Sequence, residues 1–168
     1  MLKGVLVIAA LAAGSAPNAH ASEAAILLAG AETYTLKQVV YAEPGCEIDQ
    51  QALRVLSEHQ FSRVPKLRSV AEESVPDIVL TLAVDVAAVP RGDKSPEMCL
   101  YNINLRAIHP MYGKLRYSDK AQIIQALTYS KTIFSIIVPS KVQNAIEIQT
   151  GKILGLFFDE YSQGNPTR

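Results

Sequence analysis

The chain has few side chains of the types that do chemistry, and its two cysteines come first. Cys46 and Cys99 lie far apart in the sequence, outside any C-x-x-C motif and without adjacent histidines. A thioredoxin-like redox site needs the C-x-x-C spacing, and a zinc site needs more thiolate or imidazole ligands. In an oxidising compartment a lone pair of cysteines normally forms a disulfide. We therefore expect a structural Cys46–Cys99 bridge, with two separate buried thiols as the alternative, and neither a metal site nor a cofactor.

His109, directly before Pro110, is the side chain best suited to act as a general base. An imidazole oriented by a nearby carboxylate can accept a proton from a substrate, and Asp77 and Asp119 are the candidate partners. The sequence contains no G-x-S-x-G, H-E-x-x-H, G-x-x-x-x-G-K-[ST] or G-x-G-x-x-G motif. We therefore expect a protein that is not an enzyme. A hydrolase-type enzyme that uses His109 is an alternative.

The charge of the chain argues against several classes of partner. The sequence has 16 Lys and Arg residues against 16 Asp and Glu residues, for a formal net charge of zero. It has no basic stripe of the kind that binds nucleic acid and no polybasic run that would hold an anionic membrane surface. We expect no nucleic-acid partner.

The first residues have the three-part layout of a secretory signal peptide. Lys3 precedes an apolar run, Val5–Ala13, and Ala19 and Ala21 supply small residues just before Ser22. The apolar run is about half the roughly 20 residues that a membrane-spanning helix needs. We expect a signal peptide at 1–21, no stable membrane insertion after its removal, and a periplasmic or secreted protein. A lipoprotein would need a cysteine at the cleavage point, so no lipid anchor is expected.

The remaining chain is predicted to be one domain at 22–163, followed by a disordered tail at 164–168. Apolar and polar residues alternate at 78–86 and again at 99–107, which is typical of an antiparallel sheet with one solvated face. Residues 112–138 fit either strands or a helix, and we favour strands.

Two helices should cover this sheet. Asp49 can cap the first, and Ser140 with Gln143 forms an S-x-x-Q capping box for the last. Gly151 and Gly155 lie inside the last helix, where each costs about 1 kcal/mol relative to alanine, so we expect the helix to approach the sheet closely there. The predicted fold is α+β: a mostly antiparallel sheet of three to five strands with two helices packed on one face.

The ending FFDEYSQGNP contains the pattern F-x-x-x-Y-x-x-x-N-P at Phe157, Tyr161, Asn165 and Pro166. With the signal peptide and the central strands, this pattern resembles small uncharacterised exported bacterial proteins. The order of elements is also similar to modules of envelope assembly-factor lipoproteins, such as curli-secretion lipoproteins and activators of peptidoglycan synthases. This chain departs from them in lacking the lipid-bearing cysteine, and no functional residue carries over.

The resulting hypothesis is a non-enzymatic periplasmic binding or envelope-assembly accessory protein. It would recognise an envelope protein through a sheet edge or through the solvated sheet face. The second alternative is a carrier of a small apolar ligand held between helices and sheet. Tyr101, Ile103 and Phe157 would line its groove.

Overall fold

The computed structural model describes residues 22–71, 74–89, 96–114 and 120–166. The signal peptide expected at 1–21 lies outside these residues, as does Asp119. Within the described part of the chain, no helix combines the length and the apolar character that a membrane crossing requires.

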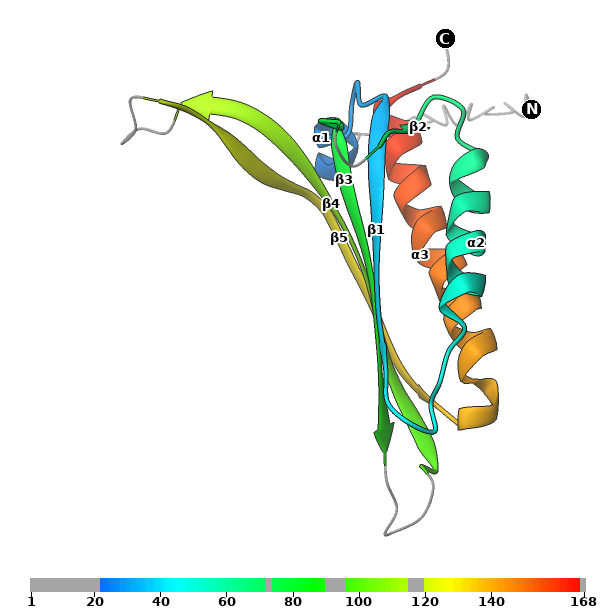
Figure 1. The fold of residues 1–168 in the computed structure, drawn as a ribbon. Coiled ribbons are helices and arrows are strands. Elements are labelled where there is room, and N and C mark those ends of the chain that lie inside the picture. The colour runs from blue at the N-terminus through cyan, green and yellow to red at the C-terminus, as the bar shows by residue number, and fades with distance from the viewer. Residues whose placement is uncertain (1–21, 72–73, 90–95, 115–119, 167–168) are drawn as a thin grey trace, which may run out of the picture.

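Five strands form one mixed sheet in the order β2-β1-β3-β4-β5, and the helices lie on one side of it (Figure 1). The strands are β1 (Thr33–Ala42), β2 (Arg68–Ser69), β3 (Ile78–Val89), β4 (Met98–Lys114) and β5 (Ala121–Ile137). The helices are α1 (Glu23–Leu27), α2 (Gln50–Ser62) and α3 (Val142–Gly164), the last preceded by a 3-10 turn, Pro139–Lys141. The predicted α+β class is confirmed.

The sheet is less uniformly antiparallel than the sequence suggested. β3, β4 and β5 are antiparallel to one another, but β1 runs parallel to both β2 and β3. A parallel pair requires a crossover connection, and α2 provides it between β1 and β2. α1 is an additional short helix that packs against α3.

The core lies between the sheet and the long helices. The apolar residues of β3 from Ile78 to Val86 are fully buried at every second position, and Cys99 to Ala107 alternate in the same way on β4. α3 adds the largest buried side chains, Phe157 and Tyr161 among them. The period-two pattern of the sequence therefore identified the buried face of both central strands correctly.

The capping prediction is confirmed for α2 and wrong for α3. Asp49 caps α2 as predicted, because its Oδ1 accepts hydrogen bonds from the N–H groups of Gln51 and Ala52. The predicted capping box at α3 is wrong: the helix begins after the 3-10 turn, with Lys141 at the N-cap and no side-chain cap. Gln143 instead accepts a hydrogen bond of 2.7 Å from the Asp49 N–H, which ties the two helix starts together.

The described residues of the ambiguous segment 112–138 are almost all in strands, as favoured: β4 continues to Lys114, β5 spans Ala121–Ile137, and 115–119 lie outside the described residues. β4 and β5 each have 17 residues, and β4 pairs with β3 only as far as Ile108. Beyond that point the two strands continue as a two-stranded ribbon that curves away from the helices (Figure 1). The pairing shifts register between Ala107 and Ile108, where the buried Thr128 hydroxyl donates to the Ala107 carbonyl.

Candidate functional site

The predicted disulfide is present and joins two parts of the fold that are distant in sequence. Cys46 and Cys99 are bonded, with their Cα atoms 5.8 Å apart, so the alternative of two separate thiols is wrong. The bridge ties the connection between β1 and α2 to the start of β4. Both residues are buried.

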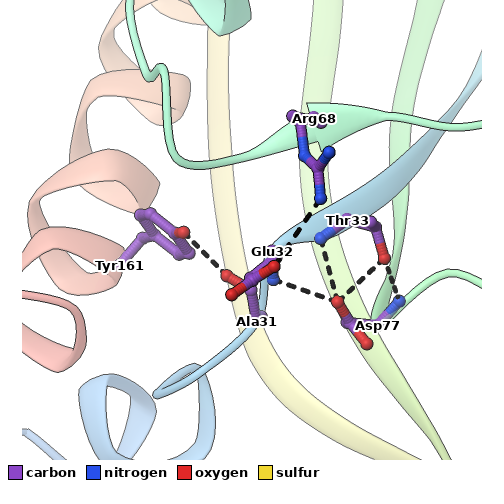
Figure 2. Close-up of polar contacts among 6 residues, drawn as sticks. All are labelled: Ala31, Glu32, Thr33, Arg68, Asp77 and Tyr161. Atoms are coloured by element: carbon purple, nitrogen blue, oxygen red, sulfur yellow. Dashed lines mark hydrogen bonds and ion pairs between the residues drawn. The ribbon is translucent and has the colours of Figure 1, made fainter.

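Asp77, the predicted partner of His109, holds the beginning of β1. Its carboxylate accepts hydrogen bonds from the N–H groups of Glu32 and Thr33, at 3.0 and 2.9 Å, and from the Thr33 hydroxyl at 2.8 Å. The Asp77 N–H in turn donates to that hydroxyl, as Figure 2 shows. No hydrogen bond joins Asp77 to His109 among the described residues, although the two are close enough for their charges to interact. The hydrolase alternative therefore stays a prediction.

The environment of Asp77 lowers its pKa. Burial by itself would raise the pKa, but the hydrogen bonds from Glu32 and Thr33, with the charge of His109, outweigh it. Because folding lowers this pKa, the unfolded state binds more protons in acid, and stability is lost as the pH falls through the folded-state value.

We expect Asp77→Asn to lower the free energy of unfolding at pH 7 by about 1–2 kcal/mol, because charge-assisted hydrogen bonds become neutral ones. The difference from the wild type should begin to shrink as the pH falls below the ordinary aspartate pKa of about 3.9, because the unfolded state then binds a proton that the folded Asp77 still resists. Urea unfolding between pH 7 and pH 3 measures both effects. Asp85→Asn, which changes an exposed carboxylate, is the control and should change little at either pH. A pH-independent difference would contradict this account.

The C-terminal motif has a structural role in the described structure. The Tyr161 hydroxyl donates to the Ala31 carbonyl at 2.7 Å, a contact drawn in Figure 2. Asn165 accepts from the Gly30 N–H and donates to the Leu28 carbonyl, so it binds both sides of the turn that follows α1. These bonds fasten the end of α3 to the entry of β1. Of the tail predicted at 164–168, Gly164 lies in α3 and Asn165 makes these side-chain bonds, whereas 167–168 lie outside the described residues.

The three residues proposed for a ligand groove lie together in the core. Tyr101, Ile103 and Phe157 are 3%, 0% and 0% exposed, respectively. Phe157 also contacts Tyr129 edge to face, with ring centroids 5.4 Å apart. A ligand between helices and sheet stays a prediction, and it would have to displace these side chains.

The sheet face opposite the helices carries a group of exposed apolar side chains that the sequence analysis did not single out. We call this group the open-face patch; its members are the exposed Val39, Tyr41, Phe134 and Ile136, together with the half-buried Leu100, which lies opposite Ile136. Tyr41 and Phe134 are 59% and 64% exposed, far more than aromatic rings of the core. The patch runs over the ends of β1, β4 and β5 nearest the disulfide.

The strand register shows how the patch is built. Tyr41 lies opposite Asp85, Asp85 opposite Asn102, and Asn102 opposite Phe134. These four side chains therefore form one row across four strands, with aromatic rings at both ends and polar groups between them. A strand spacing of about 4.8 Å separates the two rings by roughly 14 Å. A shallow hollow of about 190 Å³ lies along this row.

The polar groups of the row are not fully paired. The Oδ1 atom of Asn102 is buried and has no hydrogen-bond partner within the described part of the chain. Asp85 is exposed beside it. A buried acceptor without a partner costs about 1–3 kcal/mol, so a donor supplied from outside the chain would be favourable here.

No family model matches the sequence, and no curated protein is similar to it at a significant level. Among solved structures, the chain is similar to a DUF330 protein from Xanthomonas campestris, with 14% identity over 82% of this chain and 89% of that one, at a TM-score of 0.47. It is also similar to the PelC dodecamer from Paraburkholderia phytofirmans, with 12% identity over 76% of this chain and 87% of that one, at a TM-score of 0.45. A third is the rare lipoprotein B from Shewanella oneidensis, with 10% identity over 76% of this chain and 93% of that one, at a TM-score of 0.36.

Within the described residues, no three His, Cys, Asp or Glu side chains gather as metal ligands would. The feature with the clearest capacity for recognition is the open-face patch. Its exposed rings offer large apolar contact area, and its central polar row offers acceptors. The segment SKTIFSIIV carried the sequence signal for this patch, because two large apolar residues, Phe134 and Ile136, occupy outward-facing positions of β5.

Proposed function

We propose that this chain is an exported, non-enzymatic accessory protein that binds another protein of the bacterial envelope through the open-face patch. The observation that supports this most directly is the row from Tyr41 to Phe134 on a sheet face left bare by the helices. Exposed apolar side chains that gather on one surface commonly mark interaction sites. The predicted signal peptide and the disulfide favour an oxidising compartment.

The chemistry of the patch favours a protein as its occupant. Exposed aromatic rings on either side of a few polar groups are typical of protein–protein interfaces, in which aromatic residues are enriched. Asp85 sits within the apolar surface, so the matching surface should place a basic group beside its apolar contacts. A lipid acyl chain would leave the acceptors of Asp85 and Asn102 without donors.

Site-specific photo-crosslinking in cells that naturally make the protein tests this proposal. A photoreactive phenylalanine analogue at position 134 should give a discrete adduct with one other protein, and Asp85→Lys should reduce that adduct at least tenfold. The matched control places the analogue at position 148, where Ile148 is 59% exposed on α3; no such adduct should form there. Adducts of equal yield at both positions, adducts with lipid, or adducts between two copies of this chain would each overturn the proposal.

A further inference from the structure

The edge of β1 is paired over only a short part of its length. β2 contributes two residues, which pair with Thr33 and Tyr34. From Thr35 to Ala42, the described structure pairs β1 only with β3, on its other side. An unpaired strand edge presents a row of free N–H and C=O groups, which another extended chain can join.

The direction of these backbone groups follows from the bonds at the start of β1. The carbonyls of Glu32 and Tyr34 accept from the N–H groups of Arg68 and Val70, so even-numbered residues face the β2 side. The N–H of Glu43, an odd-numbered residue, donates to Val86 of β3. Because backbone groups alternate along a strand, those of 36, 38 and 40 point to the unpaired edge.

A groove runs beside this edge. It has a volume of about 630 Å³ and lies between β1 and α2, ending at Ser69 and Val70 of the β2 segment. Its strand wall includes Leu36, Lys37 and Gln38, and its helix wall is polar: Gln50, Gln51, Arg54 and Glu58. The volume is within the range of about 300–1,000 Å³ typical of ligand sites, and the groove continues the line that β2 begins.

Gln38 gives a second indication that the groove receives a ligand. Its Nε2 donates to the Gln50 carbonyl at 3.1 Å, which joins the strand wall to the start of α2. Its Oε1 is buried without a hydrogen-bond partner among the described residues. Burying such an acceptor is unfavourable unless a donor reaches it.

We propose that this groove binds an extended, polar peptide segment of another protein, which adds to β1 as a strand in continuation of β2. Only a polypeptide presents N–H and C=O groups at the spacing of a strand edge, and strand addition between a sheet edge and a helix is an established mode of peptide recognition. The polar helix wall selects polar side chains on the inward positions of the peptide. Arg54 and Glu58 already form an ion pair of 2.9 Å, so this wall adds little net charge to the selection.

This groove is separate from the open-face patch, and its occupancy does not depend on the function proposed for that patch. The β5 edge is also unpaired in the described structure, and a hollow of about 430 Å³ beside it is walled by α1 and by Glu160 of α3. That hollow is smaller than the groove at β1 and does not continue the line of a strand that is already paired. The β1 edge is therefore the better receptor for a single strand.

A displayed library of random 12-residue peptides, panned against the folded chain without its signal peptide, supplies the probe. Enriched peptides should be polar and free of proline at their centres. With such a peptide bound, amide exchange measured by NMR should slow at least tenfold at Leu36, Gln38 and Val40. The amides of Lys37 and Val39, which face β3, should not change.

Two matched helix variants complete the test. Gln51→Trp fills the groove and should weaken peptide affinity at least tenfold, whereas Val55→Trp, at a 54% exposed position outside the groove lining, should leave it unchanged. The proposal is overturned if no peptide is enriched, if protection appears on β5 instead, or if both variants bind equally well. Crosslinking at position 134 reports on the open-face patch alone, so the two proposals can fail separately.

Discussion

Removal of the disulfide should lower the free energy of unfolding by about 4 kcal/mol in the double variant Cys46→Ser, Cys99→Ser. The bridge spans 53 positions, and such a cross-link restricts the unfolded chain, whose loop-closure entropy it removes. The loss is large against the 5–15 kcal/mol that typically separates folded from unfolded states.

The native geometry around Cys46 does not depend on the bridge alone. The Glu43 N–H donates to the Val86 carbonyl, and the Glu43 carboxylate accepts from the Ala88 N–H at 2.7 Å. Gly45 follows with a φ of +87°, a conformation that glycine adopts without strain. These contacts remain in the double variant, so it should still fold, with its lost stability coming mainly from a freer unfolded state.

Urea unfolding of oxidised wild type, reduced wild type and the double variant measures the effect. The reduced protein and the double variant should share one midpoint, well below that of the oxidised protein. Thiol labelling of the denatured, unreduced wild type should find no free cysteine. Midpoints that coincide for all three samples would show that the bridge contributes nothing.

The elements of the fold could be predicted where local pattern decides them. The alternation in β3 and β4 is strong because one face of each strand is buried and the other is not, and the Asp49 cap follows from residue type. The parallel placement of β1 could not be predicted in this way. It depends on where α2 returns the chain, and no local pattern records that.

The candidate surfaces were harder to predict than the fold. Phe134 and Ile136 have the residue types of a buried strand, and only their register against β4 shows that they face outward. Asp77 has the residue type of a catalytic partner, but in the structure it holds Thr33 by hydrogen bonds. The two residues are 44 positions apart, so no local pattern in the sequence indicates this contact. The groove at β1 is formed by backbone groups, which the side-chain pattern does not reveal.

The position at which α3 approaches a neighbouring element most closely was also not predicted from the sequence, and substitutions of its glycines can test that position. The sequence pointed to Gly151 and Gly155 as sites of close approach, and that expectation is wrong. A Cβ at Gly155 would meet nothing within 4 Å, and at Gly151 only the end of the Gln60 side chain, at 4.0 Å. The close approach is at Gly164, where a Cβ would lie 2.0 Å from the Ala25 carbonyl oxygen and 3.3 Å from the Ala29 nitrogen.

Gly164→Ala should therefore lower the free energy of unfolding by about 2–3 kcal/mol, because the contact is with backbone that cannot rotate away. Gly155→Ala, the matched control in the same helix, should raise it by up to about 1 kcal/mol, since alanine favours the helix and no atom obstructs it. Urea unfolding gives the two signs, and NMR should show shifted amide signals for α1 only in Gly164→Ala. Asn165 and Tyr161 bind the turn after α1 from the same helix end. Displacing α1 should therefore loosen the entry of β1 as well. If both variants change the free energy of unfolding in the same direction, α1 is not held against Gly164.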